Sequence, residues 1–165
     1  NFKKIKFFKS RFDKLFFKDD SIDLLVSAGV LHHTNTNLSF MIKDHSRVIK
    51  KGGYFFVFIV GKGGQELDLW RFCRKVMKNI NVKHVYNKLN KSISPLRLQG
   101  FLDHSYGEYK TISRKSFEKL LKKNFSKITK VDGIPGADVT PKTFSNDKFF
   151  KKRFGSGNLR YLCIK

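Results

Sequence analysis

The sequence predicts an α/β fold built on a parallel sheet, and three observations support this prediction. Ile22 to Val30 and Tyr54 to Val60 have continuously apolar centres, as strands do when both faces of a sheet are covered. Between them, residues 38–49 repeat apolar side chains at the spacing of one helical face. A strand, a helix and a strand in this order form a crossover between parallel strands, and a length of 165 residues suits one domain.

The helix expected over 38–49 has signals at both ends. Asn37 suits the N-cap position, where its side-chain oxygen can accept a hydrogen bond from the first turn. The lysines at 50–51 suit the negative end of the helix dipole. The glycines at 52–53 are expected to end the helix, so that the second strand begins at Tyr54.

Further helices are expected where apolar residues recur at helical spacing. This pattern occurs over about 69–80 and 82–89, and again in a segment that Ser113 can cap. Trp70 and Met77 lie on the apolar face of the first of these helices and are expected in the core.

The other segments are expected to be strands or loops. Strands are expected at three further apolar runs, which are 5–8, 125–131 and 159–164. Gly100 to Tyr109 is expected to be a loop, and 132–157 a long irregular stretch.

The composition limits the classes of protein that fit. Hydrophobic residues make up 40% of the chain, which supplies a core and argues against a disordered protein. The formal net charge of +22 raises the question of nucleic acid or an anionic membrane. Most of the excess is lysine spread along the whole length, whereas arginine, which reads bases and phosphates, is scarce. We therefore expect a solvated lysine surface, with nucleic acid as the alternative partner.

Targeting signals and cysteines add further limits. No apolar stretch approaches the roughly 18 residues that span a bilayer, and the lysine-interrupted start is not a signal peptide. Cys73 and Cys163 are too few for a disulfide framework or a four-cysteine zinc site. Free thiols suit a reducing compartment, so we expect a cytoplasmic protein without a metal site.

Three segments, in the same order and spacing, resemble motifs of the class I S-adenosylmethionine-dependent methyltransferases, closest to their type 11 branch. Residues 19–26 (DDSIDLLV) resemble the D-x-S-F-D-hydrophobic strand of this family. Residues 27–34 (SAGVLHHT) resemble its S-x-x-V-L-H-H segment, and residues 47–54 (RVIKKGGY) resemble its R-V-L-K-P-G-G turn. Lys51 replaces the usual proline of that turn.

The resemblance implies a Rossmann-like methyltransferase sheet that lacks its first strands and ends in an antiparallel strand pair. Residues 1–165 are then the carboxyl-terminal two-thirds of one domain, with a substrate-side lid or insertion at about 65–112. The glycine-rich turn and the ribose-binding acidic residue of the family would precede residue 5. We therefore expect an N-terminally truncated domain that self-associates or pairs with a partner supplying the missing strands.

The resemblance also implies S-adenosyl-L-methionine as the cofactor. Ligands of open α/β sheets bind at the carboxyl ends of the strands. In the family an acidic residue near the place of Arg11 contacts adenine, and Asp13 is two residues away. Cofactor contacts are expected from two groups of residues, Arg11, Phe12 and Asp13 before the first buried strand, and Ser27, Ala28, Gly29, His32 and His33 after it.

Phe101 to Tyr109 is the densest polar and aromatic segment outside these motifs. An imidazole or a carboxylate could deprotonate an acceptor, and a phenol ring could stack on it. The candidate catalytic residues are His33, Asp103 and His104, and the candidate substrate-binding residues are Tyr106 and Tyr109. The alternative is a polar loop without a role in catalysis.

The function expected from this resemblance is methyl transfer to an unidentified small-molecule acceptor, mainly by aligning donor and acceptor. One alternative is a basic, RNA-associated methyltransferase piece or binding module whose lysines contact phosphates. A second is a catalytically dead remnant that serves as a subunit of another protein, which Arg11 favours. The intact S-x-x-V-L-H-H segment favours the enzyme.

Overall fold

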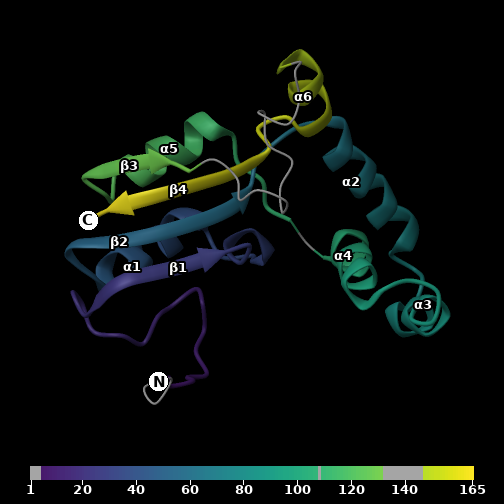
Figure 1. Cartoon of the computed structure of the whole chain (residues 1–165), viewed down its shortest axis with the longest axis horizontal. Coiled ribbons are helices and arrows are strands. Elements are labelled where there is room, and N and C mark those ends of the chain that lie inside the picture. The colour runs from purple at the N-terminus through teal and green to yellow at the C-terminus, as the bar shows by residue number, and fades with distance from the viewer. Residues whose placement is uncertain (1–4, 108, 132–146) are drawn as a thin grey trace.

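The computed structural model describes residues 5–107, 109–131 and 147–165. In this part of the chain, four strands form one sheet in the order β1-β2-β4-β3 (Figure 1). β1 and β2 are parallel, and β4 is antiparallel to both β2 and β3. The strands are β1 (Ile22–Ala28), β2 (Ile49–Val60), β3 (Lys127–Lys130) and β4 (Asn158–Ile164). The α/β class and the closing antiparallel pair are confirmed.

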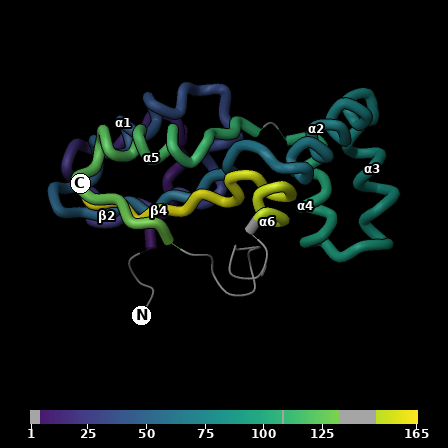
Figure 2. Tube along the Cα trace, turned by 90° about the horizontal axis from the view of Figure 1, so that it is seen from above, coloured from purple at the N-terminus to yellow at the C-terminus, as the bar shows by residue number. Residues whose placement is uncertain are grey.

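One face of the sheet carries the core. Phe55, Val57 and Ile59 alternate along β2 and are buried, as the two-residue period of a strand requires. The helices α1 (Leu38–Val48) and α5 (Arg114–Lys122) lie on this face of the sheet (Figure 2). Both helices bury one apolar stripe against the sheet, and full burial of each large side chain contributes roughly 1.5–3 kcal/mol.

The caps of these two helices are those that the sequence predicts. The Asn37 side-chain oxygen accepts a hydrogen bond from the Ser39 amide at 2.8 Å. The Ser113 hydroxyl accepts one from the Ser116 amide at 3.2 Å. His45 is buried, and its Nδ1 donates to the carbonyl of Met41 at 2.7 Å, because a carbonyl can only accept.

The prediction that the glycines at 52–53 end α1 is wrong. The helix ends at Val48, and β2 begins at Ile49. Gly52, at φ +77°, lies within β2 where the pairing with β1 shifts register, so its conformation serves a bulge. The Gly52 amide donates to the carbonyl of Lys165 at 2.9 Å, which ties this bulge to the end of β4.

β1 is the outermost strand on its side of the sheet, and its far face is open. Leu24 and Val26 are 56% and 58% exposed, and Tyr54 beside them on β2 is 45% exposed. The core-side residues of the same strand, Leu25 and Ser27, are half-buried and buried. The sequence prediction of a strand covered on both faces therefore fails for β1, because α1 and α5 cover only one face.

The segment before β1 lies beside the sheet without joining it (Figure 1). Residues 5–8 form no strand, and the side chain of Phe7 is 93% exposed, so the strand expected there is wrong. Lysines interrupt this apolar run, and no strand in the described part of the chain lies beside it to supply backbone hydrogen bonds.

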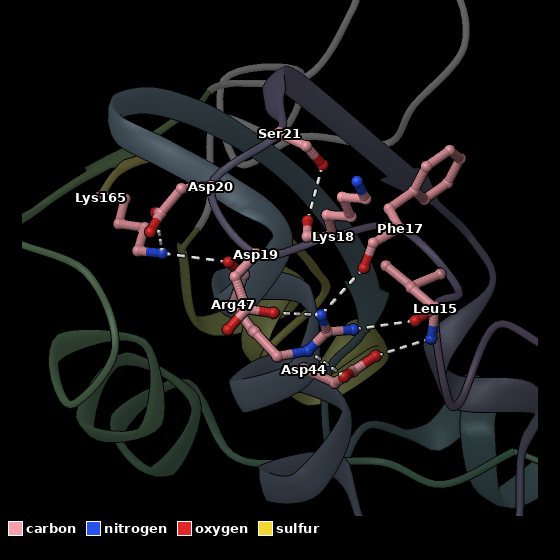
Figure 3. Close-up of polar contacts among 9 residues, drawn as sticks. All are labelled: Leu15, Phe17, Lys18, Asp19, Asp20, Ser21, Asp44, Arg47 and Lys165. Atoms are coloured by element: carbon pink, nitrogen blue, oxygen red, sulfur yellow. Dashed lines mark hydrogen bonds and ion pairs between the residues drawn. The ribbon is translucent and has the colours of Figure 1, made fainter.

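Arg47 of α1 holds the next part of this segment in place (Figure 3). Its guanidinium donates to the carbonyls of Leu15 and Phe17 at 2.8 and 2.9 Å. It also pairs with Asp19 at 2.6 Å and with Asp44 at 2.9 Å. Asp44 in turn accepts from the Leu15 amide at 2.7 Å, so one arginine satisfies several groups of a chain that lies outside the sheet.

A second group of helices lies at the end of the sheet toward which β1 and β2 run (Figure 1). These are α2 (Gln65–Met77), α3 (Val82–Leu89), α4 (Pro95–Tyr106) and α6 (Asp147–Phe154). α2 packs against α4 and α6, and α3 packs against α4. No residue of α2 or α3 is fully buried, so the core placement of Trp70 and Met77 is wrong; both are half-buried.

Two loop predictions also differ from the structure. Most of the loop expected from Gly100 to Tyr109 is the second half of α4, whose first-turn Pro95 needs no hydrogen-bond acceptor. Gly100 does not break this helix, because packing against α2 outweighs its low propensity. Within 132–157, expected to be irregular, the described residues 147–154 form α6, and residues 132–146 lie outside the described part.

Among the described residues, no helix is both long and apolar enough to cross a bilayer.

Candidate active site

The candidate site begins at the carboxyl end of β1, beside the end of its parallel neighbour β2. Ala28 is exposed there, whereas Ser27 is buried on the core side of the strand. Gly29 adopts φ +72°, and its amide donates to the carbonyl of Phe58 at 3.1 Å. A positive φ favours glycine at this turn. The 3-10 turn η1 (Leu31–His33) follows and carries both histidines to the edge of the sheet.

The ring of Tyr109 connects this edge to the helices α2 and α4. It stacks on His32 with the ring centroids 5.2 Å apart and an interplanar angle of 13°. Its centroid lies 4.6 Å from that of His33 and 5.6 Å from that of His104. His104 in turn contacts Trp70 at 4.7 Å. Five rings from four separate parts of the chain therefore form one continuous aromatic cluster.

Hydrogen bonds fix the α4 side of this cluster. The Tyr109 hydroxyl donates to Asp103 Oδ2 at 2.6 Å. Burial and this carboxylate raise the pKa of Tyr109, so the phenol keeps its proton at neutral pH. His104 Nδ1 donates to the carbonyl of Gly100 at 2.7 Å, which leaves Nε2 of a neutral ring as an acceptor. Arg74 donates to the carbonyl of His104 at 2.9 Å.

His32 is held as a neutral imidazole. Its Nδ1 accepts a hydrogen bond from the Val60 amide at 3.4 Å. Burial, together with the neighbouring His33, lowers the pKa of His32 to about 4. The side chain is almost fully buried, whereas that of His33 is half-buried. Of the two histidines, His33 is therefore the one that solvent or a ligand can reach.

The residues expected before β1 form a separate group. Arg11 Nε and NH2 donate to the two carboxylate oxygens of Asp13 at 2.9 and 2.7 Å. The Thr36 hydroxyl donates to the same carboxylate at 3.0 Å. These donors hold the pKa of Asp13 well below its usual range. Phe12 between them is 42% exposed. Thr36 thus links this group to the chain that follows η1.

One sequence-predicted residue, Tyr106, has its hydroxyl directed elsewhere. That hydroxyl, at the end of α4, donates to the carbonyl of Ile80, between α2 and α3, at 3.1 Å. Within the described part of the chain, no three His, Cys, Asp or Glu side chains gather to form a metal site.

Sequence reasoning missed the residues of α2 that face the cluster. A cavity of about 240 Å³ lies between α2, α4, α6 and the end of β2, and Glu66, Trp70 and Arg74 line it together with His104 and Tyr109. The signal was available in the sequence, because residues 66, 70 and 74 recur at intervals of four and so share one helix face. The apolar stripe beside them instead suggested a core.

Comparison with known proteins relates about a third of the chain to one family. Residues 1–57 match the family model described as a methyltransferase domain, a segment that includes β1, η1 and α1. This segment is therefore similar to a methyltransferase domain. It holds all eight expected cofactor contacts, among them the catalytic candidate His33, but neither Tyr109 nor α2 and α4.

Solved structures share the fold of the chain. One is a SAM-dependent methyltransferase from Archaeoglobus fulgidus, at a TM-score of 0.51 and 10% identity, with 90% of this chain and 62% of that chain covered. Another is the complex of the Haloferax volcanii Trm112 methyltransferase activator with a candidate methyltransferase, at a TM-score of 0.50 and 13% identity. That alignment covers 94% of this chain and 59% of the other, so the chain spans less than two thirds of these relatives. No curated protein matches it significantly.

The cofactor of this class, S-adenosyl-L-methionine, fits one group of the expected residues better than the other. At the end of β1, Ala28 is exposed and Gly29 has no side chain, which lets a ligand approach the backbone. Asp13 fits less well as an adenine contact, because Arg11 and Thr36 already donate to its carboxylate.

Proposed function

We propose that the protein transfers a methyl group from S-adenosyl-L-methionine to a small-molecule acceptor. The observation that supports this most strongly is the Tyr109 ring. It joins His32 and His33, in the methyltransferase segment, to the helices that line the cavity. A cofactor at the end of β1 and an acceptor in the cavity would then both border one aromatic cluster, where they can meet.

The cofactor supplies an activated methyl group on sulfur. Ala28 and Gly29 would present backbone to it, and the half-buried His33 would line its pocket. The neutral His32 would hold the end of β2 against η1 through its bond with the Val60 amide. Alignment of the two reactants is the main contribution that such a site makes.

The helices α2 to α4, within the proposed lid at about 65–112, would hold the acceptor. Tyr109 would line the place where acceptor and cofactor meet, with Asp103 fixing its orientation through the hydroxyl. A base is needed only if the acceptor must lose a proton. His104 would be that base, because its Nδ1–H is committed to the carbonyl of Gly100 and its Nε2 can accept.

Transfer of tritiated methyl groups by the full-length gene product tests this proposal. We expect transfer to small-molecule fractions, and at least a tenfold loss in His104→Ala, since general-base catalysis typically contributes 10²–10⁴-fold. His84→Ala, an exposed histidine of α3, is the matched control. Absence of transfer would contradict the proposal, and equal effects of the two variants would contradict the role of His104 as the base.

Cofactor affinity of the 165-residue chain is a separate question. We expect weak binding or none in titration calorimetry, because Arg11 and Thr36 already donate to the Asp13 carboxylate. Arg11→Ala should strengthen binding by releasing that carboxylate. A low-micromolar dissociation constant for the unaltered chain would show that this pairing does not obstruct the cofactor.

A second candidate function is RNA association. Lys62, Arg114, Lys130 and Lys151 line an open cleft. A cluster of cations can contact the phosphates of a nucleic acid. If the lysine surface is merely solvating, RNA binding should be weak, indifferent to structure and steeply lost with salt. Selective binding that survives about 0.2 M salt would favour this candidate instead.

A partner protein is the third part of the proposal. One similar structure is a complex with a methyltransferase activator. In this chain, Leu24 and Val26 leave an apolar sheet edge exposed. We propose that further polypeptide, from a second copy or from a partner, covers this edge in the cell.

A further inference from the structure

The cavity beside α2 is small, and half of its lining residues carry aromatic or charged side chains. Its volume of about 240 Å³ lies below the roughly 300–1,000 Å³ of sites for drug-sized ligands, which suits a molecule of one or two rings. The aromatic and charged residues that line it are Glu66, Trp70, Arg74, His104, Tyr109 and Phe154.

The aromatic side chains favour a flat ligand. The centroids of Trp70 and His104 are 4.7 Å apart, and those of His104 and Tyr109 are 5.6 Å apart at an angle of 27°. Rings in such arrangements present faces and edges on which another aromatic ring packs, at a gain of roughly 0.5–1.5 kcal/mol beyond the area buried. An aliphatic ligand would forgo that gain.

The charges at the two ends of the cavity have opposite signs. Glu66 and Arg74 lie eight residues apart on α2, so about 12 Å of helix axis separates them, with Trp70 midway. Glu66 is 3.7 Å from Arg153 in an exposed pair, which is worth little and leaves its carboxylate able to accept another donor. Cζ of Arg74 lies 5.3 Å from the centroid of the Tyr109 ring. The Arg74 guanidinium has five N–H donors, and one of them bonds the carbonyl of His104.

Trp70 supplies a second, independent observation. Its Nε1 is one of two side-chain polar atoms, within the described residues, that are buried and lack a hydrogen-bond partner. A buried donor left in this state costs roughly 1–3 kcal/mol, and a bound molecule or an ordered water is its usual explanation. The side chain that carries this donor lines the cavity, although the Nε1 atom itself is buried.

We propose that this cavity binds the methyl acceptor, and that the acceptor is a small planar aromatic compound with two different polar ends. A hydrogen-bond donor, such as an amino group, faces Glu66, and a carboxylate or carbonyl faces Arg74. The inference rests on the proposed function for its biological meaning, but the binding it describes does not require the cofactor.

The chain has a single tryptophan, so its indole N–H gives one signal in a proton–nitrogen NMR spectrum. The probe is 4-aminobenzoate, titrated without cofactor. The comparison compounds are aniline, benzoate and the non-aromatic trans-4-aminocyclohexanecarboxylate. We expect 4-aminobenzoate to shift the indole signal saturably and to bind about tenfold more tightly than aniline or benzoate, since a hydrogen bond to a charged group contributes about 1.5–3 kcal/mol. It should bind at least about twofold more tightly than the non-aromatic compound, which forgoes the ring packing.

Two variants of α2 separate the cavity from the helix that carries it. Glu66→Gln should weaken 4-aminobenzoate at least fivefold, whereas Asp68→Asn, in the same turn but paired with Arg71, should not. Equal affinities for all four compounds, no saturable shift, or equal effects of the two variants would overturn the inference. If 4-aminobenzoate does not bind but methyl transfer is observed, the proposed function is retained and the inference about the cavity is rejected. If 4-aminobenzoate binds but no methyl transfer is observed, the inference about the cavity is retained and the proposed function is rejected.

Discussion

Tyr109 illustrates how one residue can join two halves of a site. Its ring contacts His32 and His33 on one side and His104 on the other, and its hydroxyl bonds Asp103. Removing the hydroxyl alone keeps the ring contacts and breaks the bond that orients them. Replacing Tyr109 by phenylalanine therefore separates the contribution of the hydroxyl from that of the ring.

We expect Tyr109→Phe to lower the free energy of unfolding by about 0.5–1.5 kcal/mol, the usual net value of a hydrogen bond. Urea denaturation measures it. Tyr106→Phe is the matched control, because its hydroxyl bonds only an exposed carbonyl. An equal loss in the two variants would mean that the Tyr109–Asp103 bond has no special importance.

The buried histidine at position 32 predicts a pH dependence. Folding lowers its pKa from about 6.5 to about 4, so the unfolded chain binds more protons between these values. Stability should therefore fall as pH falls from 6.5 to 4, by on the order of 1–3 kcal/mol from this residue, and its contribution is fully present above pH 6.5. Burial also lowers the pKa of His45, which adds a dependence of the same sign.

Urea denaturation at pH 5, 6 and 7 measures this dependence. His32→Asn should flatten it, and His84→Asn, which changes an exposed histidine, should not. If the free energy of unfolding of His32→Asn changes with pH as it does in the unaltered chain, other groups account for the pH dependence.

At the scale of elements, the turn after β1 is the most constrained point of the site. Gly29 has φ +72°, a conformation that costs an alanine roughly 1–2 kcal/mol. Its added Cβ would meet the Phe58 ring at 3.7 Å, which is ordinary contact, so the backbone alone carries the penalty. An alanine at position 29 would therefore strain the backbone that leads into η1.

Gly29→Ala should therefore lower the melting temperature. Gly100→Ala, in the interior of α4 with nothing within 4 Å of the new Cβ, should raise it, since alanine is favoured over glycine in helices by about 0.5–1 kcal/mol. Calorimetry should therefore show changes in melting temperature of opposite sign for the two variants. A neutral Gly29→Ala would show that this turn relaxes.

The elements that the sequence predicts correctly are those in which local pattern and tertiary packing agree. α1 has its cap at Asn37 and its buried stripe, and the strand expected from Tyr54 to Val60 lies within β2. The sequence predicts a loop for the second half of α4, because its glycine and polar residues obscure a helix held by packing on α2. The motif at residues 27–34 located His32 and His33, but only the fold brings Tyr109 and Trp70 to them from far along the chain.

At the scale of the whole molecule, the open side of β1 predicts association. An apolar edge strand invites pairing with another chain, and Leu24 and Val26 extend it onto the exposed face. We expect the purified chain to self-associate, and more so as salt screens its charge of +22. Val26→Lys should reduce the association seen by light scattering.

Leu69→Lys is the matched control, because Leu69 is equally exposed but lies on α2. A stable monomer in which the amides of residues 24–26 are strongly protected from exchange would mean that the edge is covered from within.

Among the described residues, the helices at the end of the sheet bury few side chains: none in α2 or α3, Leu98 and Ser105 in α4, and Phe150 in α6. Local unfolding free energies follow buried contacts, so this group should open far more often than the sheet, and its amides should exchange sooner. A ligand that binds only the closed form would stabilise it by mass action. Slower amide exchange in α2 and α4 would then reveal ligand binding even when no methyl transfer is detected. The helices that line the cavity would be ordered in part by the ligand bound between them.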